Sequence, residues 1–384
     1  MQIYMFVFNF SKKTSIFKPN IYTFVRLGRF ITITSLMEQP KRNKKRTNII
    51  LLTAGILLLI IISAGIYIYN TIFEPFDLTE TAYIYIDEEK DYNYVVNQLQ
   101  EKTQLPNEKI FHLLADRMNY PNRIKTGRYA IVDGMTMPDV IRLLRSGVQA
   151  PVNLTFNNIR TKENLAGRFS DQLMADSLSI INVLNDTAVA ASYGFNNQTF
   201  GAMFIPNTYE VYWDTSVENL ISRMKREYDA FWNEQRKSKA EKLGLTPMKV
   251  SILASIVEEE ATYTDEYSTV AGLYLNRLEK GMRLEADPTV KYAVGDPTLR
   301  RILFKHLEVE SPYNTYKNDG LPPGPIRIPS IKGIDAVLNP TEHNYLFMCA
   351  KDDLSGRHNF AVTHAEHARN ARAYQRALNE RGIY

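Results

Sequence analysis

The strongest hydrophobic pattern in the chain is a run of 21 residues without charge, at positions 49–69. As a helix, such a run spans roughly 30 Å, the thickness of a bilayer core. A cleaved signal peptide would have a shorter apolar core and a small-residue cleavage site, which Tyr67-Ile-Tyr-Asn70 does not offer. We therefore predict an uncleaved transmembrane helix. Basic residues precede it: Lys41, Arg42, Lys44, Lys45 and Arg46. This bias predicts a cytoplasmic N-terminus and an extracytoplasmic chain after about residue 70.

After a short predicted linker at 70–78, the pattern indicates a small α/β unit over residues 79–150. Alternating or apolar runs predict strands at 82–86 and 127–132, and apolar residues at helical spacing predict helices at 91–100 and 107–118. A last helix starts at Thr136, a good N-cap, and stops at Gly147.

Residues 151–384 are predicted to form a larger domain of mixed helices and strands. A strand at 152–156 leads into mainly helical sequence, in which 201–213 is an aromatic-rich interruption and Ser216 caps a helix to about residue 239. Further elements are two helices near 246–261 and 270–277, a loop region rich in Pro and Gly, a strand at 345–350 and a helix at 364–380. The fold class predicted outside the membrane is α+β.

Composition narrows the class of protein further. Of 384 residues, 45% are hydrophobic and 23% are charged, as in chains that fold around a core. The single cysteine, Cys349, excludes an intramolecular disulfide framework, and we expect it to be a small core residue. Part of the net charge of +4 comes from the basic run, so no nucleic-acid-binding face is indicated. Residues 1–48 are predicted to be cytoplasmic, with Met37 as the true start and 1–36 as a mis-assigned leader.

The segment 246–261 combines a buried stripe with three consecutive glutamates. On a helical wheel, Glu259 points to solvent, whereas Glu258 and Glu260 lie at the two edges of the apolar stripe. A carboxyl at such an edge is partly desolvated, which raises its pKa and suits it to act as a general acid on a glycosidic oxygen. The alternative is an ordinary solvated helix end. The stripe consists of Val250, Leu253, Ala254, Val257 and Ala261.

Polar residues follow this helix pair in turn-rich sequence. Amides and carboxylates bind hydroxyl groups and tyrosine rings offer stacking faces, so these residues could hold a polymeric sugar. The alternative is that they only stabilise turns. The candidates are Asn276, Arg277, Asp287, Thr289, Tyr313, Asn314 and Tyr316.

Five motifs in a fixed order carry a resemblance to a known family. They are Ala-Ser-Ile-Val-Glu-x-Glu (254–260), Val-Ala-Gly-x-x-x-Asn-Arg-Leu (270–278), Gly-Met-Arg-Leu-x-x-Asp-Pro-Thr-Val (281–290), Tyr-Asn-Thr-Tyr (313–316) and Gly-Leu-Pro-Pro-Gly-Pro-Ile (320–326). With them the chain resembles the MltG (YceG-like) family of endolytic murein transglycosylases, over about residues 49–384. Each motif alone is weak, but the five in order are specific.

The resemblance implies that Glu260 is the catalytic acid and Glu258 a supporting carboxylate. It also implies a LysM-like module at 79–150 and a catalytic domain at 151–384, in a single-pass inner-membrane protein with its catalytic domain in the periplasm. The implied reaction cleaves bonds between N-acetylmuramic acid and N-acetylglucosamine in nascent peptidoglycan, leaving 1,6-anhydro ends without a cofactor. Implied partners are glycan strands and the synthases of the elongation machinery. One departure is Asn207, where the family usually carries Asp, so an acidic role is not expected there.

Two other functions stay open from the sequence: a membrane-anchored peptidoglycan-binding scaffold without turnover, and a hydrolytic muramidase. Glu260 favours an enzyme over a scaffold, and only the product separates the two enzymes. A metal centre is not expected. His358, His364 and His367 cluster near the C-terminus, but the His-Glu-x-x-His pattern is absent and packing or hydrogen bonding explains them better.

Overall fold

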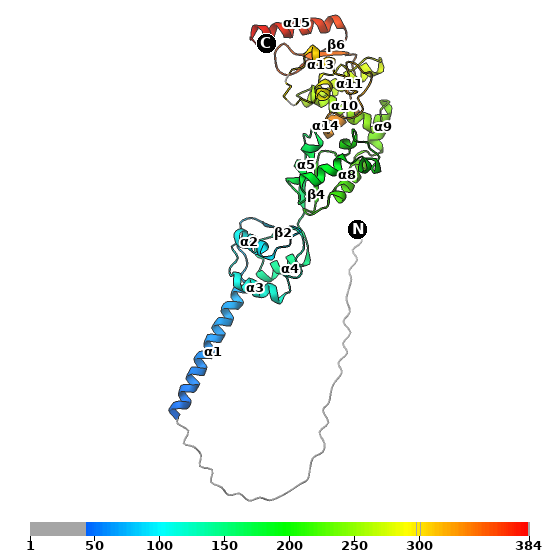
Figure 1. Cartoon of the computed structure of the whole chain (residues 1–384). Helices are drawn as coiled ribbons and strands as arrows, with labels where there is room; N and C mark the ends of the chain where they lie inside the picture. Colours follow the sequence, from blue (N-terminus) through cyan, green and yellow to red (C-terminus); the bar gives the residue numbers. More distant parts are fainter. Residues whose placement is uncertain (1–43, 297, 300, 383–384) are drawn as a thin grey trace, which may run out of the picture. The chain divides into compact units, whose positions relative to one another are not determined.

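The computed structural model describes residues 44–296, 298–299 and 301–382 (Figure 1). The segment 1–36 and the predicted start at Met37 therefore lie outside the described residues. Helix α1 (Lys44–Phe73), the long blue helix in Figure 1, is the one described helix that is long and apolar enough to cross a membrane. It continues through residues 70–73, which the sequence had assigned to the linker. Pro75 explains the actual end, because the residue before a proline is pushed out of the helical conformation.

The elements predicted between residues 79 and 150 are confirmed in type and order. They are β1 (Ala82–Ile86), α2 (Tyr92–Thr103), α3 (Glu108–Arg117), β2 (Gly127–Ile131) and α4 (Met137–Ser146). The two strands pair antiparallel, with Ala82 opposite Ile131. Thr136 and Asp139 form a capping box at the start of α4, and Gly147 ends it with φ 78°, a conformation that favours glycine.

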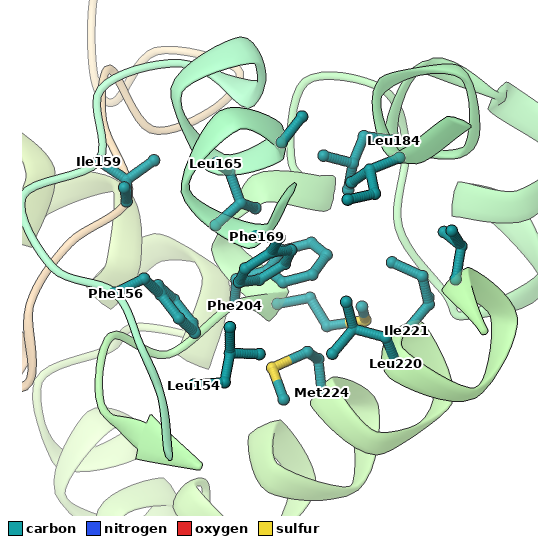
Figure 2. Packing of buried hydrophobic residues seen from close by; sticks show 14 of the residues in the cluster. Leu154, Phe156, Ile159, Leu165, Phe169, Leu184, Phe204, Leu220, Ile221 and Met224 are labelled. Carbon is teal, nitrogen blue, oxygen red and sulfur yellow. The ribbon is translucent and has the colours of Figure 1, made fainter. Parts of the chain in front are cut away.

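The next part of the chain, up to residue 242, has a core rich in phenylalanine. Figure 2 shows Phe156, Phe169 and Phe204 packed together with Leu154, Leu220 and Met224. The elements around this core are β3 (Val152–Thr155), α5 (Lys162–Ser170), α6 (Ser177–Asn185), α7 (Thr187–Ser192), the 3-10 helix η1 (Phe200–Met203), β4 (Thr208–Val211) and α8 (Val217–Phe231). Helix α9 (Glu234–Lys242) follows and contributes Ala240 to the next core instead. Strands β3 and β4 pair antiparallel.

The prediction of one continuous helix from Ser216 to about residue 239 is wrong. Trp232 leaves the helical conformation at ψ 58°, and α9 starts after Asn233, whose side chain accepts a hydrogen bond from the backbone N–H of Arg236. A buried Trp232 side chain thus ends one helix while an asparagine cap begins the next.

The last part of the chain begins with α10 (Pro247–Glu260), whose residues from Val250 to Glu258 are all buried. Helices α9, α11, α12 and α14 contact it. The apolar stripe predicted for this helix is therefore only part of the surface that the helix buries. The elements after α10 are η2 (Thr264–Glu266), α11 (Tyr267–Glu279), α12 (Asp287–Val294), α13 (Phe304–Leu307), α14 (Ile331–Leu338), β5 (Phe347–Ala350), β6 (His358–Ala361) and α15 (His364–Glu380). Strands β5 and β6 pair antiparallel, which completes a mixed α+β fold.

Truncating Phe169 to alanine tests the phenylalanine core. Its side chain is fully buried, and its ring meets that of Phe156 edge to face with centroids 5.2 Å apart. Phe169→Ala should lower the unfolding free energy by about 3–5 kcal/mol, because it removes buried area and leaves a cavity. The measurement is chemical denaturation of the full chain in detergent. Leu178→Ala, at a side chain 67% exposed, is the control and should change stability by no more than about 0.5 kcal/mol. Equal losses in the two variants would contradict the packing described here.

Candidate active site

Glu260 is the last residue of α10 and borders a pocket of about 330 Å³. The pocket brings together segments far apart in sequence, since α10, α11, α12, the 313–316 turn and strands β5 and β6 all contribute to its wall. The polar and aromatic side chains that line it are Glu260, Tyr274, Arg277, Glu285, Asp287, Tyr316, Phe347, His358 and His367.

The carboxyl group of Glu260 has the electrostatic properties of a general acid. Burial raises its pKa to about 7, and the nearby Asp287 adds to this increase. Tyr274 works in the opposite direction, because its hydroxyl donates a hydrogen bond of 2.6 Å to Glu260 Oε1. With a pKa near 7, a substantial fraction of Glu260 carries its proton at neutral pH and can deliver it to a leaving group.

Asp287 is another carboxyl group in the pocket wall, and it interacts electrostatically with Glu260. It occupies the first position of α12, where Pro288 favours the helical start. The hydroxyl of Tyr316 donates to Asp287 Oδ1 at 2.7 Å. Burial and this bond to a carboxylate together raise the pKa of Tyr316. The phenol therefore keeps its proton and remains a hydrogen-bond donor to Asp287.

Arg277 also lines the pocket, and its guanidinium supports the pocket wall. Its Nε donates to the carbonyl of Arg283 at 2.8 Å and its Nη1 to the carbonyl of Leu346 at 3.0 Å. It forms an ion pair with Glu285 as well. The buried guanidinium thus ties α11 to the chain on both sides of the pocket.

Glu258 does not line this pocket but is buried beside the start of α14. It accepts hydrogen bonds from the backbone N–H of Ser330, at 2.7 Å, and from the Ser330 hydroxyl, and Arg327 Nε lies 3.3 Å from its Oε2. Burial nevertheless raises the pKa of Glu258. Glu258 therefore links the last turn of α10 to the start of α14.

The prediction that Glu259 points into solvent is wrong. Its side chain is only 16% exposed, because Arg327 Nη1 and Arg160 Nη2 reach its two oxygens at 2.8 and 3.0 Å. These arginines come from loops distant in sequence, so the helical wheel could not have placed them.

Four of the other predicted binding residues lie outside the Glu260 pocket. Thr289 and Asn314 are buried and bond to nearby backbone carbonyls, those of Ala286 and of Leu307 and Val309. Asn276 donates to the carbonyls of His343 and Tyr345 at 2.8 and 3.1 Å and thereby holds a loop. Tyr313 lines a different pocket. The predicted residues that the pocket does bring together are Glu260, Arg277, Asp287 and Tyr316.

Sequence reasoning did not single out Tyr274, the hydrogen-bond partner of Glu260. It lies within the predicted helix at 270–277, where a tyrosine among apolar residues looks like core. Its position fourteen residues after Glu260 gives no local signal, since only the packing of α11 against α10 brings the two side chains together.

His358, His367 and Cys349 line the Glu260 pocket and contact neighbouring protein groups. His358 Nδ1 lies 3.1 Å from Oε2 of the buried Glu266, and His367 stacks on Phe347. Cys349 was expected in the core but is only partly buried, on the pocket wall, where burial raises the pKa of its thiol. Within residues 44–296, 298–299 and 301–382, no three His, Cys, Asp or Glu side chains form a metal-binding group.

Comparison with known proteins identifies the family. A model of the YceG-like family matches residues 84–373, and the chain belongs to this family. It is 29% identical over 341 residues to a Bacillus subtilis (strain 168) protein named endolytic murein transglycosylase, with 84% of this chain and 93% of the relative covered. A Streptococcus pneumoniae (strain R6) protein of the same name is 27% identical over 353 residues, with 81% of this chain and 63% of that longer relative covered.

A solved structure is also similar in sequence. It is the crystal structure of a yceG-like protein from Listeria monocytogenes, 28% identical to this chain, with 76% of this chain and 99% of that one covered and a TM-score of 0.49.

Tyr274→Phe should raise the pKa of Glu260 above its value of about 7, because the hydrogen bond from the Tyr274 hydroxyl stabilises the carboxylate form. The pKa can be followed through the infrared band of the protonated carboxyl, using the difference between a protein with Glu260 and its Glu260→Gln variant. Tyr263→Phe, at a partly exposed hydroxyl that donates to the Ser355 carbonyl, is the control. A fall in the Glu260 pKa in Tyr274→Phe would show that the hydroxyl does not stabilise the carboxylate.

Gly333→Ala tests the contact between Glu258 and α14. A Cβ at position 333 would lie 2.1 Å from Glu258 Oε1, so the carboxyl would have to leave Ser330. Losing a buried hydrogen-bond partner should cost about 1–3 kcal/mol of unfolding free energy. Gly167→Ala is the matched control: this glycine lies in α5 with no atom within 4 Å of the added Cβ. Thermal unfolding should show a lower stability for Gly333→Ala than for Gly167→Ala. Equal stability would mean that the hydrogen bonds between Glu258 and Ser330 do not stabilise the fold.

Proposed function

We propose that this protein is an endolytic murein transglycosylase that cleaves the bond between N-acetylmuramic acid and N-acetylglucosamine within peptidoglycan strands. The observation that carries the proposal is Glu260, a carboxyl with a pKa of about 7 at the wall of a pocket. The name shared by the B. subtilis and S. pneumoniae relatives supports it. YceG-like membership is in agreement with this activity.

In the proposed reaction, Glu260 acts first as acid and then as base. Its proton passes to the glycosidic oxygen as the bond from muramyl C1 to that oxygen breaks, and the N-acetylglucosamine leaves with a free C4 hydroxyl. The Glu260 carboxylate then takes the proton of the muramyl C6 hydroxyl as O6 bonds to C1. A 1,6-anhydro end results, the carboxyl is protonated again and no water is consumed.

The surroundings of Glu260 suit this double use. The negative charge of Asp287 and the burial both favour the protonated form needed for the first step. After the proton has left, the Tyr274 hydroxyl stabilises the carboxylate that serves as base. Asp287, the candidate water-activating carboxyl of a hydrolase, accepts the Tyr316 hydroxyl at Oδ1.

The proposed location follows from the membrane helix. Helix α1 anchors the protein in the inner membrane, with the basic run at 41–46 on the cytoplasmic side and the catalytic domain, residues 151–384, outside. The unit at 79–150 would be a LysM-like module that holds glycan. From such an anchor the enzyme would meet nascent strands beside the synthases of the elongation machinery and end their growth.

Glu260→Gln tests the proposal directly, because the amide keeps the shape of the side chain but carries no acidic proton. Full-length protein in detergent would be incubated with polymeric peptidoglycan, and 1,6-anhydromuramyl ends counted by mass spectrometry. The variant should lose about 10²–10⁴-fold in rate. Glu241→Gln, an exposed glutamate on α9, should retain the full rate.

The product decides between the remaining functions. Reducing ends in place of anhydro ends would mean a hydrolytic muramidase. Binding of glycan without any cleavage, unaffected by Glu260→Gln, would mean a scaffold.

A further inference from the structure

A second pocket, of about 360 Å³, is lined by residues from the 313–316 and 320–326 motifs that do not line the Glu260 pocket. Tyr313, and Pro325 from the motif at 320–326, line it. The motif packs closely there, since a Cβ on Gly324 would lie 2.8 Å from the Tyr313 hydroxyl and 2.5 Å from the Gln198 carbonyl. Tyr313 was predicted to contact a sugar polymer, so the second pocket is where such a contact has to be sought.

The two pockets share two segments of chain. Helix α12 contributes Asp287 to the Glu260 pocket and Tyr292 to the second pocket, and the 313–316 turn contributes Tyr316 to the first and Tyr313 to the second. The second pocket also reaches the end of α10, because Arg160 and Arg327 from its wall pair with Glu259, the residue before Glu260. A group bound in the second pocket would therefore lie near the same helix end as the bond at Glu260.

Three cations line the second pocket: Arg160, Lys162 and Arg327. The two arginines are paired with carboxylates of α10, since Arg160 contacts Glu259 and Arg327 contacts both Glu258 and Glu259. Lys162 forms no ion pair with a described residue, although Glu163 also lines the wall. Lys162 is therefore the cation of this wall that remains available to an anionic group.

Lys162 is the cation best placed to bind that group. Among the described residues its ammonium donates only to neutral oxygens, the carbonyl of Leu184 at 2.8 Å and the side-chain amide of Asn197. An ammonium has three donors, so one is left for a ligand. Burial lowers the pKa of Lys162, and a bound carboxylate would counter this by stabilising the charged form.

We propose that this second pocket binds a carboxylate of the peptide stem that branches from the glycan strand cleaved at Glu260. The proposal rests on the proposed function, because it assigns a part of the same substrate. Murein differs from a plain amino-sugar polymer in that its muramyl residues carry short peptides with free carboxyl groups. The ammonium of Lys162 takes the carboxylate, while the rings of Tyr292, which is 43% exposed, and Tyr313, 4.7 Å away between centroids, contact the apolar parts of the stem.

The test compares two substrates: glycan strands that carry their stems, and the same strands after an amidase has removed the stems. For full-length protein in detergent, kcat/KM for release of anhydro ends is measured on both. The ratio of the two values should be at least about tenfold in favour of stem-bearing strands, as expected for one charge-assisted hydrogen bond. Because the ratio is taken within one protein sample, partial loss of folded enzyme cancels from it.

Lys162→Gln, which keeps a hydrogen-bond donor for Leu184 and Asn197, should bring the ratio close to one, mainly through a higher KM on stem-bearing strands. Lys162→Arg, which keeps the charge, should restore part of the ratio. Lys237→Met, at an exposed lysine on α9 paired with Glu234, is the control and should leave the ratio as it was.

A ratio near one with Lys162 in place would overturn the stem proposal while leaving the transglycosylase intact, as would an unchanged ratio in Lys162→Gln. Absence of anhydro ends from both substrates would instead overturn the proposed function, on which the stem proposal depends.

Discussion

The burial of α10 is the constraint on which the site depends. A surface helix ending in three glutamates would expose all three to water, and their pKa values would stay low. Here α9, α11, α12 and α14 pack around the helix, so its last turn lies in a poorly solvated environment. The C-terminal end of a helix is also the negative end of its dipole, which disfavours a carboxylate. Burial, with the charge of Asp287 added to it, raises the pKa of Glu260 so that its proton stays on at a pH where a free glutamate has lost it.

Successive residues of a helix point 100° apart, and in this last turn the rotation gives three adjacent carboxyl groups three different partners. Glu258 turns inward to Ser330 and the first turn of α14, and Glu259 meets two arginines. Only Glu260 faces a pocket. The first two glutamates stabilise the position of the helix end through contacts on either side, and the direction of the third follows from them. The spacing of the Glu-x-Glu motif thus determines which carboxyl group contacts α14 and which one lines the pocket.

Local pattern predicted the elements well where caps and periodicity agree, as in β1, α4 and the capped start of α10. It also placed Glu260 at the edge of the core. It failed where the outcome depended on residues far away in sequence: the arginine partners of Glu259, the tyrosine beside Glu260, and the break between α8 and α9. In turn-rich sequence the pattern could not tell which polar side chains face a pocket and which bond to backbone, so Asn276 and Asp287 looked alike.

The buried polar residues that miss the Glu260 pocket still matter for it. Thr289 on α12 and Thr315 in the 313–316 turn are almost fully buried, and their hydroxyl oxygens lie 2.8 Å apart. Thr315 also accepts the backbone N–H of Ala286, just before α12. These bonds join the two segments that form both pockets. Since a buried hydrogen bond is lost only at a considerable cost, these threonines hold α12 and the 313–316 turn together, although their own side chains line neither pocket.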